Sequence, residues 1–457
     1  MSPRFNAIDC RPRQADVSEC SSDTQAVPPG SERTRDLMGN WTFRGVSPAP
    51  VLALAALLAL LSGCLADDDD PGGGAETATF PLASTPTFPV TAVATSEPTQ
   101  ALPAWFENII APGPLLTAPE RVYFVNGPDL WSLEADGSAG QVTRQLRVAA
   151  AAGAPDGGRA AVVVRTEIGT RSAEEIRLVS AAGDVGEPVY GPEITEGPGS
   201  IAPIEQIVWR PDGQALALVH ANGLVRWLPV DGEGDGRAPT DLLNVDDIDT
   251  VVEALWAPTG AGLVALARDA QGAGRLYVVS STGERAMLGR DLEAVPSIGV
   301  FDWLPGRGRL VIVEDRAVGP NSLAGSIFSV APDGTGRELL VSGGRFAPVT
   351  DVLRMQASPD GLWLAFTVYL PDADGEPSFL SLWLLEIESG NLIEVAVPAT
   401  FRVTDLWWSS AGLVWRGVDR DAPSPLGEER YGGSEPFVIA IAATDGSSRV
   451  VFQSDER

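Results

Sequence analysis

The chain has 457 residues, of which 49 are glycine and 37 are proline, and 44% of it is hydrophobic. This composition suits one large β domain rich in turns, with further segments appended. The 61 acidic residues outnumber 32 basic residues, all of them arginine, and give a formal net charge of −29. Such a surface repels nucleic acid and anionic lipid, so we expect no nucleic-acid partner and favour cationic partners or metal ions.

The first 63 residues divide into two segments. Residues 1–37 are polar and lack apolar periodicity, and Met38 begins a short stretch with one positive charge. An apolar run from Val51 to Leu61 follows, and its 11 residues are too few for a membrane-spanning helix but fit the core of a signal peptide. We therefore interpret residues 38–63 as a signal peptide, and residues 1–37 as a mis-annotated start or a non-structural extension.

The apolar run ends in Leu61-Ser62-Gly63-Cys64, which resembles the lipobox of bacterial lipoproteins. In that family the cysteine is lipidated and the bond before it is cut. The resemblance therefore implies that Cys64 is the mature amino terminus and anchors the protein to a membrane in the cell envelope, outside the cytoplasm. The alternative is an ordinary secretory signal with an incidental cysteine.

Residues 64–103 hold four consecutive aspartates, three glycines and then a tract of threonine, alanine, proline and serine. Few of these residues can bury apolar surface, so we expect a disordered tether. A flexible chain of this length reaches roughly 30–40 Å on average. The predicted domain at 104–457 would therefore stand clear of the membrane surface.

Within 104–457 a unit of short strands and tight turns recurs. Its clearest copy is the stretch from Val208 to Gly232, where alternating apolar residues flank turns rich in proline, aspartate and glycine. A first turn recurs at Pro155-Asp156-Gly157, Pro211-Asp212-Gly213, Pro258-Thr259-Gly260, Pro305-Gly306 and Pro359-Asp360-Gly361. A later turn recurs at Gly137, Gly183, Gly232, Gly283, Gly334, Gly390 and Gly446.

The spacing of these landmarks, 46 to 56 residues, predicts an all-β fold, a β-propeller with four strands in each blade. The count favours seven blades over six or eight. An aromatic or apolar residue stands just before the first turn of the unit, and we interpret the tryptophans at this place as packing between blades. These residues are Trp209, Trp256, Trp303 and Trp408.

The units resemble those of TolB-like and WD-repeat-like propellers, in which an apolar residue precedes Ser-Pro-Asp-Gly and a further apolar strand. The closest matches are Ala357-Ser358-Pro359-Asp360-Gly361 and Trp209-Arg210-Pro211-Asp212-Gly213. The resemblance implies the fold but not the function, because propellers carry many activities. Seven units rather than six, and the lack of an obvious amino-terminal α/β domain, depart from TolB.

Parts for catalysis are scarce in this sequence. The chain has one histidine, His220, which we interpret as a polar turn residue rather than a member of a catalytic triad, and it has no Gly-x-Ser-x-Gly motif. A pair of carboxylates in the central channel, serving a hydrolase or a lyase, is the enzymatic alternative. The sequence favours a non-catalytic binding or scaffolding module without deciding against this alternative.

Blade geometry places the Pro-Asp-Gly turns on one face and the long loops on the other. The long loops are 241–252, 314–326, 371–379 and 419–436, and we expect them to bind a protein partner or a small ligand. Solvated loops without a partner are the alternative. We expect no cofactor, save that Asp372, Asp374 and Glu376 faintly resemble a calcium loop. The candidate binding residues are Asp246, Asp247, Asp249, Asp372, Asp374, Glu376, Asp419, Asp421, Arg430 and Tyr431.

Overall fold

The computed structural model describes residues 104–195, 197, 200–230, 239–243, 250–269, 271–288, 297–314, 325–346, 351–371, 377–420 and 436–454. All of them belong to the unit Thr95–Arg457. The predicted signal peptide, Cys64 and the predicted tether lie outside the described residues, so these predictions stay untested.

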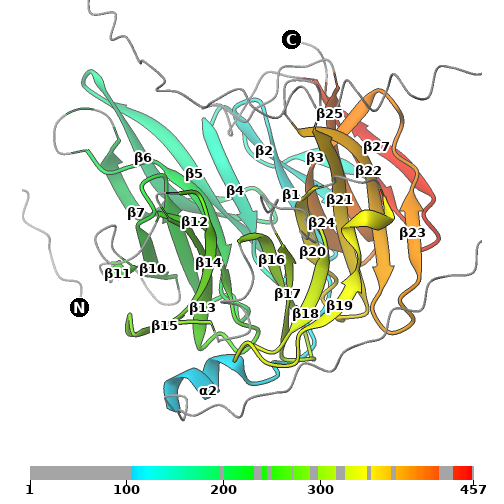
Figure 1. The fold of residues 1–457 in the computed structure, drawn as a ribbon. Coiled ribbons are helices and arrows are strands. Elements are labelled where there is room, and N and C mark those ends of the chain that lie inside the picture. Colours follow the sequence, from blue (N-terminus) through cyan, green and yellow to red (C-terminus); the bar gives the residue numbers. More distant parts are fainter. Residues whose placement is uncertain are drawn as a thin grey trace, which may run out of the picture. The chain divides into compact units, whose positions relative to one another are not determined.

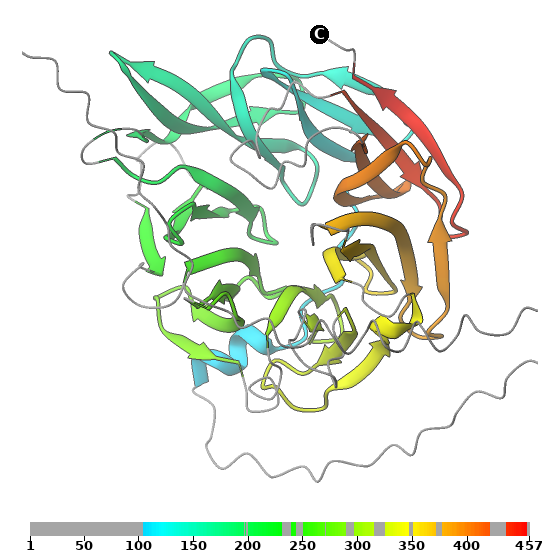
Figure 2. The same ribbon diagram turned by 45° about the horizontal axis from the view of Figure 1, so that its top comes forward.

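Seven antiparallel sheets stand around a common axis in this unit (Figure 1 and Figure 2). The expected seven-bladed β-propeller is thereby confirmed. Six blades have four strands, and the first has three among the described residues. In chain order the blades are β1 (Arg121–Asn126), β2 (Asp129–Glu134) and β3 (Ala139–Gln141); β4 (Val148–Gly153), β5 (Arg159–Ile168), β6 (Arg171–Ser180) and β7 (Val185–Ile194); β8 (Ile204–Trp209), β9 (Ala215–His220), β10 (Val225–Pro229) and β11 (Thr240–Leu243); β12 (Thr250–Trp256), β13 (Gly262–Arg268), β14 (Gly274–Ser280) and β15 (Arg285–Met287); β16 (Ile298–Leu304), β17 (Arg309–Glu314), β18 (Ile327–Val330) and β19 (Glu338–Val341); β20 (Asp351–Ala357), β21 (Trp363–Pro371), β22 (Pro377–Glu386) and β23 (Leu392–Val395); β24 (Phe401–Ser409), β25 (Gly412–Asp419), β26 (Phe437–Ala442) and β27 (Ser448–Gln453).

The tight turns predicted from Pro-Asp-Gly join the first and second strands of their blades. In the turn after β8, the amide of Gly213 donates to the carbonyl of Arg210 at 2.8 Å, and Gly213 has φ of +71°. Glycine adopts this left-handed conformation without the steric cost that a side chain would add. The carboxylate of Asp212, the residue before Gly213, accepts a second hydrogen bond of 2.9 Å from the amide of Gln214 and further stabilises the turn.

The tryptophans that end the inner strands pack between blades, as expected. Trp209 donates through Nε1 to the carbonyl of Ala152 in the preceding blade at 2.8 Å, and Trp256 donates in the same way to Val208 at 3.1 Å. Each indole thus adds a directed hydrogen bond to a large buried apolar surface. Trp303 lacks this bond, and its buried Nε1 has no partner in the described part of the chain.

Two short helices occur among the described residues, α2 (Ala104–Ile110) and the 3-10 turn η1 (Gly343–Arg345). Phe106 and Ile109 of α2 are buried in the apolar cluster of the fourth and fifth blades. A Cβ on Gly262 would lie 2.4 Å from Ile109 Cδ1, so only glycine lets the helix approach β13 this closely. No helix in the described residues is long and apolar enough to cross a membrane.

Residues 111–120, here called the crossing segment, connect α2 to β1 along the face that carries the Pro-Asp-Gly turns. The amide of Leu116 donates to the carbonyl of Pro359 at 3.1 Å, and the amide of Ser410 donates to Pro119 at 2.9 Å. The segment therefore touches the turns of the sixth and seventh blades before it enters the first. The last blade owns all four of its strands, so the ring closes without a strand shared between the ends of the chain.

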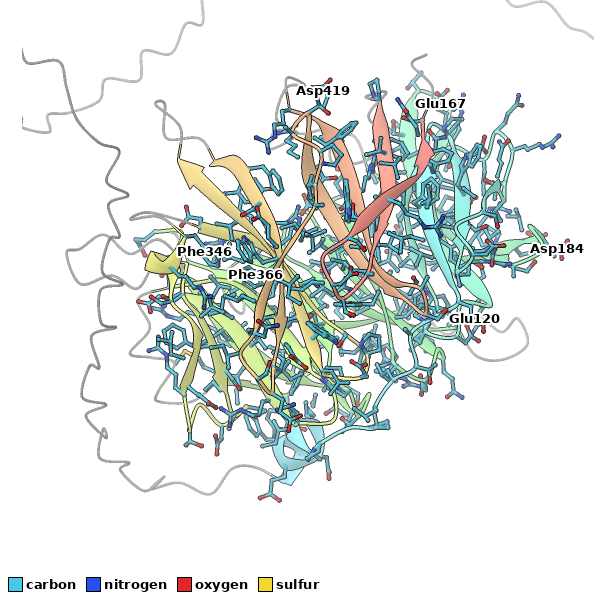
Figure 3. The ribbon with its side chains drawn as sticks, turned by 90° about the vertical axis from the view of Figure 1, so that its right-hand side faces the viewer. Glu120, Glu167, Asp184, Phe346, Phe366 and Asp419 are labelled. Carbon is cyan, nitrogen blue, oxygen red and sulfur yellow. The ribbon has the colours of Figure 1, made fainter. Side chains whose placement is uncertain are left out.

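Two opposite faces result from this topology. The turn face carries the Pro-Asp-Gly turns and the crossing segment. The long-loop face carries the connections from second to third strands and those between blades. Glu120 and Asp419 lie toward these two opposite faces in Figure 3, on the turn face and the long-loop face respectively.

Candidate functional site

Of the ten candidate binding residues, Asp419 lies in the described part of the chain. It is exposed at the end of β25, on the long-loop face. The other nine fall outside the described residues, and with them the calcium candidate: Asp246, Asp247, Asp249, Asp372, Asp374, Glu376, Asp421, Arg430 and Tyr431. Among the residues that the structure describes, no group of three metal-ligating side chains occurs.

A groove on the sixth blade lies next to two of the predicted long loops. Its first hollow, of about 260 Å³, opens between η1 of the fifth blade and the outer strands β22 and β23. Its second hollow, of about 270 Å³, opens between the same strands and the end of β25 in the seventh blade. The two hollows share Ser381 and Glu394, so they form one surface, here called the blade 6 groove. Its principal residues are Arg345, Phe346, Phe379, Ser381, Trp383, Glu394 and Arg420.

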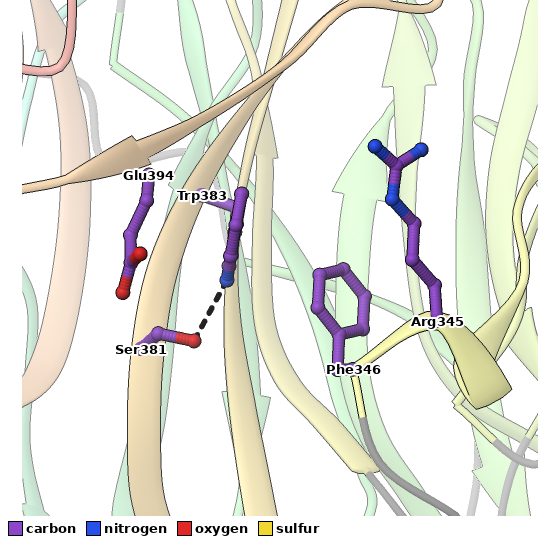
Figure 4. Close-up of a pocket in the computed structure, with 5 residues that line it drawn as sticks. All are labelled: Arg345, Phe346, Ser381, Trp383 and Glu394. Atoms are coloured by element: carbon purple, nitrogen blue, oxygen red, sulfur yellow. Dashed lines mark hydrogen bonds between the residues drawn. The ribbon is translucent and has the colours of Figure 1, made fainter. Parts of the chain in front are cut away.

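The strand register explains how the first hollow is built. Trp383 on β22 lies directly opposite Glu394 on β23, so the two side chains share one face of the blade. Ser381 lies two residues earlier on the same face, and its hydroxyl accepts a hydrogen bond of 2.7 Å from Trp383 Nε1 (Figure 4). This bond satisfies the indole and holds its ring against β22. Phe346 packs on the same indole, with ring centroids 5.3 Å apart and planes tilted by 50°.

Charged groups stand at the ends and in the middle of the blade 6 groove. Arg345 lies on the η1 side of Phe346, and Glu394 lies on the far side of Trp383 (Figure 4). Neither side chain forms an ion pair or hydrogen bond with another described residue. At the other end, Arg420 donates to the carbonyl of Phe401 at 3.0 Å and lies 5.2 Å from the centroid of Phe379.

A second charged cluster, here called the axial cluster, lies on inner strands. The first strand of each blade lies at one edge of its sheet, and β12 and β16 each carry a half-buried carboxylate among buried apolar residues. These carboxylates belong to Glu253 on β12 and Asp302 on β16. Arg354 on β20 completes the axial cluster, and its Nε donates to the carbonyl of Thr404 at 3.0 Å.

Asp302 joins two blades. Its carboxylate accepts one hydrogen bond of 2.7 Å from its neighbour Trp303 and another of 2.7 Å from the amide of Ala357 on the next inner strand. Burial raises the pKa of Asp302 to about 7, although these two hydrogen bonds lower it. Gln206 makes a comparable link between blades, since it accepts from the amide of Ala254 at 3.0 Å. The hydrogen bonds thus assign Asp302 a structural role.

Glu253 has a different position from the one its sequence suggested. In the sequence it stands just beyond the acidic connector 241–252, but in the structure it is a half-buried residue of β12, directly after a register shift between Val251 and Glu253. Burial and the charge of Asp302 raise the pKa of Glu253 to about 7, while Arg354 opposes the rise. Glu253 therefore lies within electrostatic range of both Asp302 and Arg354.

His220 ends strand β9 and is buried, so its description as a polar turn residue was incomplete. Its carbonyl accepts from the amide of Gly223 at 2.8 Å and so begins the predicted turn. Its Nδ1 lies 2.7 Å from the carbonyl oxygen of Ala202, and its Nε2 has no hydrogen-bond partner among the described residues. Burial lowers the pKa of His220, and no carboxylate is hydrogen-bonded to its ring among the described residues. This geometry does not form a catalytic triad.

The sequence reading missed the blade 6 groove. The sequence predicts packing between blades for Trp383, and Trp383 does pack against the cluster that joins the fifth and sixth blades, but it also lines this groove. Arg345 and Glu394 were not singled out, because 49 residues separate them and each stands in an unremarkable local context. The one available signal was Ser381-Leu382-Trp383, where a polar and an aromatic residue share the same strand face.

Comparisons with known proteins support the fold alone. No protein-family model matches this chain, and no curated protein matches it either. A solved prolyl endopeptidase is 11% identical with a TM-score of 0.50; the match covers 77% of this chain and 51% of that one, so the chain spans about half its length. A protein from Agrobacterium tumefaciens assigned as TolB is 18% identical, with a TM-score of 0.39, over 58% of this chain and 84% of that one. Oligogalacturonate lyase from Vibrio parahaemolyticus is 14% identical, with a TM-score of 0.45, over 74% and 86% respectively. The last two scores are too low to support an argument, and the first supports a β-propeller without indicating an activity.

Proposed function

We propose that this protein is a lipid-anchored, extracytoplasmic binding or scaffolding module whose partner docks on the long-loop face. The observation that carries the proposal is the blade 6 groove, where the side chains of Arg345 and Glu394 flank aromatic side chains and form no hydrogen bond or ion pair with another described residue. Exposed loops on a rigid scaffold are where binding residues concentrate. The groove adjoins the ends of the 371–379 and 419–436 loops, so groove and loops can act as one surface.

The test uses the acidic loops predicted from the sequence. Asp246, Asp247, Asp372 and Asp374 are changed together to asparagine, and capture of a partner from envelope extract is measured at low and high salt. Attraction between exposed charges is screened beyond about 8–10 Å at physiological salt, so the effect should be largest at low salt. A matched control changes four exposed turn-face residues to asparagine: Asp136, Asp156, Asp184 and Asp212. If capture depends on the control set instead, the binding surface lies on the turn face.

The anchor has its own test. Replacing Cys64 with serine should block lipidation and move the protein from the detergent phase to the aqueous phase in a partition experiment. Expression from Met38 alone should give the same mature species. If the Cys64→Ser variant still partitions into the detergent phase like the unchanged protein, Cys64 does not anchor it. If the mature protein forms only when residues 1–37 are present, translation does not start at Met38.

A second candidate function is a carboxylate-dependent hydrolase or lyase acting at the axis. The observation that favours it is the raised pKa of both Glu253 and Asp302, since a general acid works best with a pKa near the working pH. The hydrogen bonds of Asp302 argue for structure instead. Glu253→Gln distinguishes the candidates: it should abolish any turnover at the axis and leave partner capture unchanged.

A further inference from the structure

The blade 6 groove has a fixed order of chemical groups along its length. From η1 to the seventh blade it presents a cation, aromatic rings, an anion, another aromatic ring and a second cation. The groups are Arg345, then Phe346 with Trp383, then Glu394 in the first hollow, and Arg420 over the largely buried ring of Phe379 in the second hollow. Figure 4 shows the first part of this order, with Arg345 and Glu394 on opposite sides of the two rings.

The aromatic part of the groove is rigid before any ligand arrives. The indole of Trp383 is held by its hydrogen bond to Ser381, and Phe346 is wedged between Trp383 and Phe366, the latter at 5.9 Å between centroids (Figure 3). Phe379 packs edge-on against Tyr369 at 5.6 Å. Binding to these rings therefore costs little side-chain entropy, which favours an apolar ligand group in each hollow.

The polar groups of the groove are mainly charged. Ser381 is its neutral polar side chain, and its oxygen accepts a hydrogen bond from Trp383. The guanidinium of Arg345 and the carboxylate of Glu394 supply the other donors and acceptors of the first hollow. The groove thus combines hollows for apolar side chains with charges of both signs. Each hollow, at about 260–270 Å³, has room for one large side chain or several waters, each of which occupies about 30 Å³.

We propose that the blade 6 groove binds an extended segment of a protein partner, with two apolar side chains in the hollows and a basic side chain between them against Glu394. Acidic side chains at the two ends of the segment meet Arg345 and Arg420. Alternate residues of an extended chain face one side, so the motif is read at every second position. This inference rests on the proposed function and names the chemistry of the partner.

Charge complementarity is the part of this proposal that a substitution can reverse. Against Glu394 a basic residue is attracted and an acidic residue is repelled. In Glu394→Lys the preference at the central position should change from basic to acidic. Rim charges of this kind change affinity by about tenfold or less per pair, so selection among many peptides detects them better than one affinity measurement.

The experiment selects peptides from a displayed random library with the mature protein, its Glu394→Lys variant and its Trp383→Ala variant. Glu388→Lys, a charge reversal at an exposed position of the same blade outside the groove, is the matched control. Wild type and control should enrich apolar-x-basic-x-apolar peptides with acidic flanks. Glu394→Lys should enrich an acidic centre, and Trp383→Ala should lose selection at one apolar position. Thermal melts of all variants establish that each is folded.

The proposal is overturned if no peptide motif is enriched, or if Glu394→Lys enriches the same motif as the wild type. It is also overturned if the groove binds free oligosaccharide in place of peptide. These outcomes are separate from failure of the proposed function. Partner capture that responds to the loop variants, with no charge pattern in the selected peptides, would leave the binding role intact and remove only the peptide motif.

Discussion

The turn face and the long-loop face are built from the same seven blades but use their polar groups in opposite ways. On the turn face, aspartates such as Asp212 accept hydrogen bonds within their own turns, and the crossing segment hydrogen-bonds to the turns of two blades. On the long-loop side, Arg345 and Glu394 have no partner among the described residues. Groups satisfied within the chain stabilise the ring, whereas groups left available can bind a partner.

The largest expected effect on stability comes from removing the apolar packing of α2 against the propeller on the turn face. Phe106→Ala removes a ring that is 1% exposed and ties α2 to the fourth blade. Substitutions of this kind cost about 3–5 kcal/mol, so the free energy of unfolding should fall by that amount in chemical denaturation. Peptide selection by the blade 6 groove should survive under conditions in which the variant is folded.

Glu107→Ala is the matched control, because Glu107 is an exposed neighbour on the same helix. It should change the free energy of unfolding by less than about 0.5 kcal/mol. Equal stability of Phe106→Ala and wild type would mean that α2 and the crossing segment do not hold the ring together.

A smaller effect comes from the axial cluster, through pH. The pKa of Glu253 is about 7 in the folded protein against 4.5 for an ordinary glutamate, so the folded state binds this proton more tightly than the unfolded state. The corresponding stability is fully present below pH 4.5 and is lost as pH rises through 7. Glu253→Gln should therefore reduce the loss of stability between pH 5 and pH 8 by about 1–3 kcal/mol. If the free energy of unfolding of Glu253→Gln and of the wild type changed by the same amount between pH 5 and pH 8, the raised pKa of Glu253 would be contradicted.

The smallest effect compares two tryptophans at equivalent places. Trp256→Phe removes the hydrogen bond to Val208, whereas Trp303→Phe removes an indole nitrogen that has no partner among the described residues. Because both variants replace an indole with the same smaller ring, the difference between their free energies of unfolding should reflect the hydrogen bond. Trp256→Phe should be the more destabilising by about 1 kcal/mol in the free energy of unfolding. If Trp303→Phe were the more destabilising of the two, the Nε1 of Trp303 would donate a hydrogen bond in solution.

The fold could be predicted because its signals are local and repeated. A turn such as Pro211-Asp212-Gly213 uses residues that are adjacent in sequence, and a tryptophan before it completes a unit that recurs through the chain. The groove is a different kind of feature. Arg345 and Glu394 come from different blades, and they meet only because η1 lies beside β22 and β23. Glu253 was misplaced because a register shift of one residue changes which side of the strand a side chain faces.

The most direct test of the division between the faces is site-specific photo-crosslinking in the intact envelope. A photoreactive amino acid replaces Arg345 in the blade 6 groove in one variant and the exposed Leu362 on the turn face in another. We expect a protein adduct from position 345, whose crosslinked peptide carries apolar residues on either side of a basic one, and none from position 362. An adduct from position 362 alone, or the same adduct from both positions, would contradict the division between the faces.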